Sequence, residues 1–179
     1  FGEIWARGDF LNYVLFLFGG SVFYGGLLGG LFAGRTYAEK KRLPVDGYSD
    51  IAASMIPLFH VFGRLGCFFS GCCYGVESSF GFVYRYSPVA EANGVCRFPV
   101  QLLEAGCNLL LFVVLYWLLR KGFQRGRLLY FYLIAYGCIR FADEFLRGDS
   151  YRGVFFGIST SQGIAVATIL VSVILLLKN

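Results

Sequence analysis

Apolar residues are gathered into long blocks along this chain rather than spaced at the intervals of an amphipathic helix. Each block is about 20 residues long, the length that a helix needs to cross a hydrocarbon core of about 30 Å. The pattern predicts an all-α, polytopic transmembrane helical bundle with about five spans. These are residues 10–33, 51–70, 102–119, 128–146 and 158–177, in a single membrane domain of residues 1–179 with one longer outer segment at about 71–99.

The composition agrees with a membrane protein, because 57% of the 179 residues are hydrophobic and only 15% are charged. The net charge of +5 does not indicate nucleic-acid binding, since Lys and Arg are concentrated in alternate connections, as in the positive-inside pattern. The N-terminus, residues 71–99 and residues 149–157 are then expected outside. The residues expected on the cytoplasmic side are Arg35, Lys40, Lys41, Arg42, Arg120, Lys121, Arg125, Arg127 and Lys178.

The start of the chain carries a glycine-rich first span. The chain opens at Phe1 rather than at a methionine, and the residues ahead of the first span show no signal-peptide pattern. We therefore expect earlier spans to come before this sequence. The small-xxx-small spacing of the glycines suits close packing of two helices. The alternative is a broken helix whose backbone N–H groups approach a lipid headgroup. Helix packing and a broken helix are compatible with each other. The glycines are Gly19, Gly20, Gly25, Gly26, Gly29, Gly30 and Gly34.

The fourth span contains charges that are expensive in a membrane. Arg140, Glu144 and Arg147 are spaced to share one helical face. Arg140 falls near the middle of the span, where an unpaired charge costs roughly 2.5–3.5 kcal/mol. Intramembrane charges of this kind are usually functional, although an Arg140–Glu144 pair that only satisfies itself is an alternative.

The second and third spans supply further polar groups. Arg64 stands near the end of an apolar run. Gln101, Glu104 and Asn108 share a face of a helix that should begin at a proline. A carboxylate at the depth of Glu104 needs a cationic or hydrogen-bonding partner, which either Arg64 or Arg140 could be, and a place in the membrane interface is the alternative. The fifth span opens with the spacing of a capping box, in which Ser159 and Gln162 satisfy free backbone amides.

The roles of His60 and of the cysteines can each be interpreted in more than one way. His60, the only histidine, lies one turn before Arg64, and it is either a candidate acid-base group or a hydrogen-bonded packing residue. Disulfides are plausible for cysteines outside the cytoplasm. The spacing C-x4-C-C is not a zinc-type pair, and we therefore assign no metal ligand and no cofactor. The cysteines near or beyond the outer face are Cys67, Cys72, Cys73 and Cys96.

Several motifs, taken in order, make the chain resemble the prolipoprotein diacylglyceryl transferases, which are bacterial membrane enzymes. Gly63-Arg64-Leu65-Gly66-Cys67-Phe68 is similar to the core of the family signature, Gly-Arg-x-Gly-Asn-Phe. The likeness includes Gly25 to Gly29, Asp50, Pro99-x-Gln101-Leu102-x-Glu104, the run from Tyr136 to Arg147, and Ser161 with the following Gln162 and Gly163.

Three positions depart from the family pattern. Cys67 replaces an asparagine, Cys72 replaces an acidic residue, and Tyr24 replaces the histidine of a Phe-His-Gly-Gly segment. The chain could therefore be a divergent branch with the same reaction or a paralogue with another acceptor.

The resemblance implies transfer of the diacylglyceryl group of phosphatidylglycerol, or another anionic phospholipid, to a lipobox cysteine of a secreted preprotein. The enzyme would be a multi-pass protein of the bacterial cytoplasmic (inner) membrane with its active face outside. The catalytic candidates are Arg64, Arg140, Glu144, Tyr24 and His60. The substrate-binding candidates are Gly25, Gly26, Gly63, Gly66, Cys67, Cys72, Gly75, Gln101, Glu104 and Arg147.

Two other classes of function stay open at this point. In the first, the cysteines carry out thiol redox or metal chemistry and the arginines only hold lipid. In the second, the chain is a non-catalytic lipid-binding subunit.

Overall fold

The computed structural model describes residues 29–30, 32–123, 126–148, 154–155 and 158–178. Residues 1–45 and 46–179 form two compact units. In the first unit, residues 32–40 are helical, and Arg35 Nε lies 2.8 Å from Glu39 Oε1 on the exposed surface. Tyr24, Gly25 and Gly26 lie outside the described residues.

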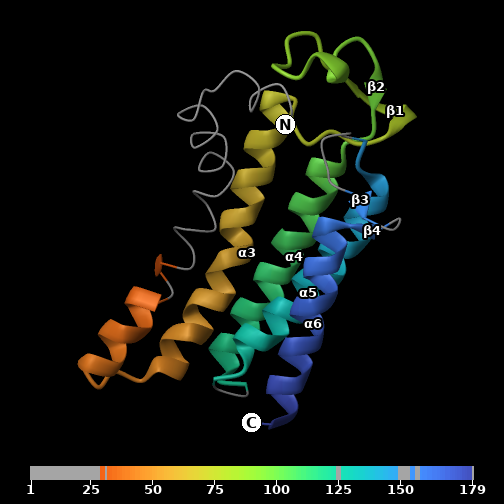
Figure 1. The fold of residues 1–179 in the computed structure, drawn as a ribbon. Coiled ribbons are helices and arrows are strands. Elements are labelled where there is room, and N and C mark those ends of the chain that lie inside the picture. The colour runs from red at the N-terminus through yellow and green to blue at the C-terminus, as the bar shows by residue number, and fades with distance from the viewer. Residues whose placement is uncertain (1–28, 31, 124–125, 149–153, 156–157, 179) are drawn as a thin grey trace, which may run out of the picture. The chain divides into compact units, whose positions relative to one another are not determined.

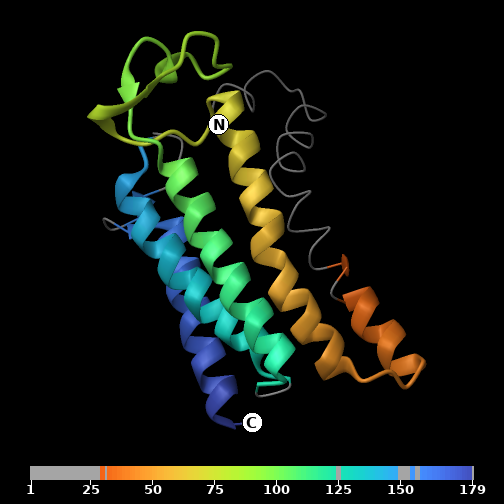
Figure 2. The ribbon, with the colours of Figure 1, turned by 180° about the vertical axis from the view of Figure 1, so that it is seen from behind.

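Among the described residues, the helices of the second unit labelled in Figure 1 are α3 (Val45–Ser70), whose first residue belongs to the first unit, α4 (Val100–Lys121), α5 (Leu128–Asp143) and α6 (Thr160–Lys178). The helix α5 packs against both α4 and α6, and the reverse view shows these three helices running side by side (Figure 2). The prediction of an all-α bundle is confirmed. The two short hairpins pair β1 (Glu77–Val83) with β2 (Cys96–Arg97), and β3 (Val154–Phe155) with β4 (Ile158–Ser159).

Three helices of the described chain are long and apolar enough to cross a membrane: Val45–Ser70, Val100–Lys121 and Ser161–Lys178. They coincide with the predicted spans 51–70, 102–119 and 158–177, although α3 begins at Val45. The predicted span 128–146 is divided into α5, of 16 residues, and the 3-10 turn η2 (Glu144–Leu146). The predicted span 10–33 lies mostly outside the described residues.

The side chains of the second unit are distributed as expected for helices in lipid. Large apolar side chains such as Leu110, Leu170 and Leu177 are exposed. A membrane interior offers no hydrophobic drive to bury such groups, whereas a polar group in lipid needs a protein partner. The buried polar residues include Asp50, Ser54, Gln101, Glu104, Asn108, Asp143, Glu144, Gln162 and Ser172.

The helix boundaries follow local sequence signals. Pro99 precedes α4 as its N-cap, as predicted, and Gly122 ends the helix in the left-handed conformation with φ 65°. At the start of α6, the Ser159 N–H donates to Gln162 Oε1 at 3.0 Å, and the Gln162 N–H donates to Ser159 Oγ at 3.1 Å. The predicted capping box is therefore confirmed.

Asp50 of α3 caps the N-terminus of α5 from a different helix. Its Oδ2 accepts the Gly126 N–H at 2.6 Å, and its Oδ1 accepts the Leu128 N–H at 3.0 Å. A negative charge is favourable at a helix N-terminus, where backbone N–H groups have no partner within the helix. Asp50 therefore ties α3 to the α4–α5 connection.

We expect Asp50→Ala to lower the free energy of unfolding by about 2–3 kcal/mol, because it removes two charge-assisted hydrogen bonds and leaves two buried donors unpaired. Unfolding in detergent micelles measures the loss. Asp46→Ala, four residues earlier on the same helix, is the matched control. An Asp50→Ala protein as stable as this control would contradict the capping role.

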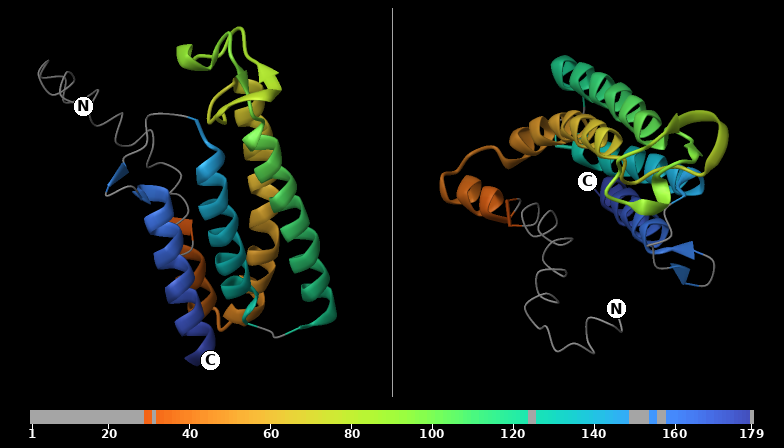
Figure 3. Two further views of the ribbon diagram at one scale, coloured as in Figure 1. Left: turned by 90° about the vertical axis from the view of Figure 1, so that its right-hand side faces the viewer. Right: turned by 90° about the horizontal axis from the view of Figure 1, so that it is seen from above.

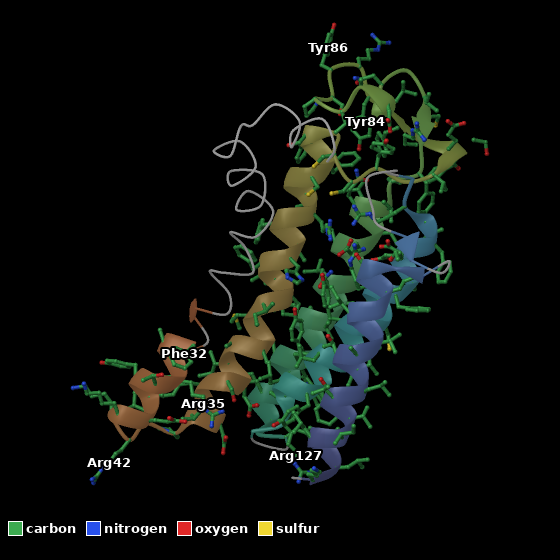
Figure 4. All side chains as sticks on the ribbon, in the orientation of Figure 1. Phe32, Arg35, Arg42, Tyr84, Tyr86 and Arg127 are labelled. Atoms are coloured by element: carbon green, nitrogen blue, oxygen red, sulfur yellow. The ribbon has the colours of Figure 1, made fainter. Side chains whose placement is uncertain are left out.

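The outer segment and the basic α4–α5 connection lie at opposite ends of the second unit. Figure 4 shows Tyr84 and Tyr86 at one end of the helices and Arg127 at the other. In Figure 3 the β1–β2 hairpin lies over the end of α3 and the start of α4. The segment predicted to lie outside and a basic connection predicted to lie on the cytoplasmic side are therefore at opposite ends of the helices. Which side of the membrane each end faces stays a prediction.

Candidate functional site

Arg64 of α3 is paired with Glu104 of α4. Arg64 Nε lies 2.9 Å from Glu104 Oε1, and the Glu104 side chain is only 2% exposed whereas that of Arg64 is 18% exposed. The predicted polar face of α4 is also confirmed, since Gln101 and Asn108 are buried with Glu104. Of the two partners considered for Glu104, the structure shows Arg64 as its ion-pair partner.

Arg140 of α5 has contacts with both its own helix and α6. Its Nη2 lies 3.3 Å from Glu144 Oε2 and donates to Ser161 Oγ at 3.2 Å. The pairing of Arg140 with Glu144 that the sequence suggested is therefore present. Arg140 Nη1 is buried without a hydrogen-bond partner among the described residues. This guanidinium thus keeps a donor for a further acceptor.

Tyr136 and Asp143 connect the two arginines. Tyr136 interacts electrostatically with the guanidiniums of both Arg64 and Arg140. Asp143 interacts electrostatically with the same two arginines and with Glu104. Two arginines from separate helices therefore belong to one polar cluster.

Sequence reasoning did not single out Asp143 as a site residue. A signal for it existed, because Tyr136, Arg140 and Asp143 stand at positions i, i+4 and i+7 of one helix and so share a face. Ser161, which contacts Arg140, appeared in the sequence analysis only within a motif.

His60 lies among aromatic and amide side chains. Its ring centroid is 4.7 Å from that of Tyr136 and 6.5 Å from that of Tyr132. Asn108 and Arg64 are also among its polar neighbours. These contacts match the packing alternative for His60 and place it beside the arginine cluster.

Gln101 joins α4 to the outer segment. Its Nε2 donates to the carbonyl of Cys72 at 2.8 Å and to the Tyr84 hydroxyl at 3.4 Å. Burial raises the pKa of Tyr84, and burial together with the neighbouring Cys73 raises the pKa of Cys72. Both groups are therefore protonated at neutral pH, and Gln101 holds the segment around Cys72 and Tyr84 against α4.

Arg147 does not share the helical face of Arg140 and Glu144, contrary to the sequence prediction. The helix ends at Asp143, and Arg147 follows η2 with extended backbone, where it forms a β-bridge with Gly75. No space is left for a side chain at Gly75, since an added Cβ would collide with the Phe98 carbonyl oxygen. Gly75 is thus a site of close backbone packing.

Gly63 and Gly66, which flank Arg64 on α3, have the opposite surroundings. Both are exposed, and a Cβ added at either position would meet no described atom within 4 Å. No described residue therefore packs closely against α3 at these two glycines. The remaining predicted residues, Cys67 and Cys72, lie at the outer end of α3, close to Gln101.

Comparison with known proteins agrees with this arrangement. The profile of the prolipoprotein diacylglyceryl transferase family matches residues 5–178. The phosphatidylglycerol–prolipoprotein diacylglyceryl transferase of Clostridium tetani is 37% identical over 156 residues, which are 86% of this chain and 62% of that protein. The proteins of the same name from Teredinibacter turnerae and Idiomarina loihiensis are 34% and 35% identical over 94% of this chain, and the matches cover 60% and 65% of those proteins.

The chain therefore spans about three fifths of the length of these relatives. The match of the profile covers nearly every residue, and it includes both arginines and their paired carboxylates. The chain belongs to the prolipoprotein diacylglyceryl transferase family.

Proposed function

We propose that this chain transfers the diacylglyceryl group of phosphatidylglycerol to the lipobox cysteine of a prolipoprotein. The reaction takes place at the outer face of the bacterial cytoplasmic membrane. The observation that carries the proposal is the cluster in which Arg64 and Arg140, from α3 and α5, share Tyr136 and Asp143 as neighbours. The family and the names of the relatives supply the substrates.

The arginines bind the phosphate of the lipid. Arg64 uses Nε for Glu104, and Arg140 Nη1 is a buried donor without a partner among the described residues. Planar guanidiniums suit the oxygens of a phosphate, and their hydrogen bonds are strong where water is scarce. Glu104 and Glu144 hold the two guanidiniums in position while other N–H groups face the lipid. The exposed glycines Gly63 and Gly66 give the headgroup a path to Arg64.

The reaction exchanges one bond for another. The cysteine thiolate forms a C–S bond to the glyceryl carbon, the bond from that carbon to the phosphate oxygen breaks, and glycerol phosphate leaves with the electron pair. The arginines stabilise the charge that builds up on the leaving phosphate.

The acceptor thiol needs activation, because a cysteine with a pKa near 8.5 is only a few per cent thiolate at neutral pH. The candidates for the base are Glu144, Glu104, His60 and a relay through Tyr24. Among these, His60 stands beside the cluster and next to Tyr136. The base is left open between them.

We expect Tyr24→Phe to lower kcat by roughly 10- to 100-fold if the hydroxyl relays a proton, with little change in KM, since general acid-base catalysis contributes about 10²- to 10⁴-fold. The transfer rate with labelled lipid measures the effect. Tyr37→Phe, at an exposed tyrosine of the first unit, is the control. Equal rates for Tyr24→Phe and the control would remove Tyr24 from the candidates.

The proposal is tested by incubating the purified protein with labelled phosphatidylglycerol and a lipobox peptide. A mass gain of one diacylglyceryl group on the peptide cysteine, together with release of glycerol phosphate, is the expected result. A peptide in which serine replaces the cysteine is the control. Release of glycerol phosphate without modification of the peptide would indicate a different acceptor, and no release in the presence of both substrates would contradict the proposal.

A further inference from the structure

Three thiols converge at the outer end of α3. The Sγ atoms of Cys67, Cys72 and Cys73 all lie within 4.8 Å of one another. All three side chains are of intermediate exposure. Sequence spacing alone argued against a metal site, because C-x4-C-C is not a standard pair. We refer to Cys67, Cys72 and Cys73 as the three-thiol cluster.

The way in which α3 ends brings the first two thiols together. The Gly71 N–H donates to the Phe68 carbonyl at 3.2 Å, and the Cys72 N–H donates to the Cys67 carbonyl at 3.1 Å. Gly71 has φ 70°. These are the two hydrogen bonds and the left-handed residue of a Schellman motif, which folds the second residue after the helix back onto the last turn. In this chain the residue that folds back is Cys72, and the residue of the last turn that it meets is Cys67.

The backbone of Cys73 then turns again. Its φ is 55°, a value that is uncommon for a residue other than glycine. Residues held in such conformations cost of order 1–3 kcal/mol and are concentrated at functional sites and ligand clamps. The turn keeps the third thiol beside the other two. The left-handed backbone conformation of Cys73 therefore completes the cluster.

We propose that the three-thiol cluster binds one thiophilic metal ion of the Zn²⁺ class, with a fourth coordination position left for a water or another ligand. Thiolates select soft or borderline ions such as Zn²⁺ and Cu⁺. With Zn–S bonds of about 2.3 Å in a tetrahedral arrangement, the sulfur atoms stand about 3.8 Å apart. This separation is within the 4.8 Å limit that the three sulfur atoms already satisfy. A disulfide would need two sulfurs at about 2.05 Å and would leave the third unused.

The local charge supports an anionic metal centre. Three thiolates and one Zn²⁺ carry a net charge of −1, and binding releases three protons. Arg64 interacts electrostatically with both Cys67 and Cys73. Its guanidinium therefore compensates the charge of the loaded site. The second neighbour is Gln101, whose Nε2 donates to the Cys72 carbonyl at 2.8 Å.

Cobalt binding to the full, reduced chain in detergent tests this proposal. Co²⁺ is the probe because tetrahedral thiolate coordination gives a charge-transfer band and visible d–d bands. We expect one Co²⁺ per chain, displaced by one Zn²⁺. Cys67→Ser, Cys72→Ser and Cys73→Ser should each weaken binding by at least ~100-fold, since even changes outside the coordination sphere cost about 10- to 100-fold.

Two further variants distinguish coordination from loss of fold. Cys96→Ser removes a cysteine of the same outer segment that is outside the cluster, and it should bind Co²⁺ as the unaltered chain does. Gly71→Ala keeps every thiol but disturbs the Schellman motif, because its Cβ would meet Ser87 Cβ at 2.8 Å. It should weaken Co²⁺ binding. Elution as a single detergent-solubilised species checks that each variant is folded.

The proposal is overturned if the reduced chain shows no thiolate–cobalt band. It is also overturned if folded Cys72→Ser and Cys73→Ser proteins bind Co²⁺ as tightly as Cys96→Ser. The readout is metal binding and involves neither lipid nor peptide. Its failure would therefore leave the proposed transfer reaction untouched, and failure of the transfer assay would leave the metal site untouched.

Discussion

Replacing Arg140 with alanine is expected to lower kcat/KM for diacylglyceryl transfer by roughly 10²- to 10³-fold, the loss typical when one donor to a developing negative charge is removed. Arg140 supplies a buried N–H without a partner in the described chain, and its other nitrogen is fixed by Glu144 and Ser161. Arg64→Ala should have a loss of the same order. The measurement is the initial rate with labelled phosphatidylglycerol and the lipobox peptide.

Two controls make this result specific. Arg35→Ala removes an exposed arginine that is paired with Glu39 in the first unit, and it should leave the rate unchanged. Arg140→Lys keeps the charge but loses the planar fork, and it should recover only part of the activity. A folded Arg140→Ala protein that is as active as Arg35→Ala would refute the phosphate-binding role.

The second large effect is expected on stability. Glu104→Gln should lower the free energy of unfolding by about 3–5 kcal/mol, because breaking a buried ion pair leaves an uncompensated charge behind. Glu104 is 2% exposed and faces Arg64 at 2.9 Å. Unfolding in mixed detergent micelles measures the change.

The chain contains a matched control for this experiment. Arg35 and Glu39 form an ion pair of 2.8 Å whose side chains are 71% and 54% exposed. Glu39→Gln should therefore change stability by only ~0–0.5 kcal/mol. If Glu104 and Glu39 variants lose the same stability, the buried pair is not what holds α3 to α4. A double variant in which Met replaces both Arg64 and Glu104 should recover much of the loss, since it removes the orphaned charge.

The predictable part of the fold was the part governed by local rules. The apolar blocks predicted the helices, Pro99 predicted the start of α4, and the spacing of Ser159 and Gln162 predicted the capping box. The end of α5 was not predictable in the same way. Its last turn becomes η2, and Arg147 leaves the helix to pair with Gly75, a contact that depends on residues about 70 positions away.

The residues of the candidate site also differ in whether local sequence or tertiary packing determines their roles. Both arginines were identified because a charge in an apolar block is costly. The choice of Arg64 rather than Arg140 as the partner of Glu104 depends on how α3 packs on α4, which spacing does not determine. Asp50 was noted in sequence as part of a motif, but its role in capping α5 arises from tertiary contact. Thiol or metal chemistry of Cys67, Cys72 and Cys73 was kept as an alternative, but their spacing did not predict that the three sulfur atoms converge, because that geometry comes from a turn.

That turn has an evolutionary consequence. The three-thiol cluster occupies residues 67–73, and its shape is set by a glycine-closed helix end rather than by several helices meeting. Because the cluster lies within one short stretch of sequence, a few substitutions in that stretch are enough to create or remove it, and the helices of the bundle need not change.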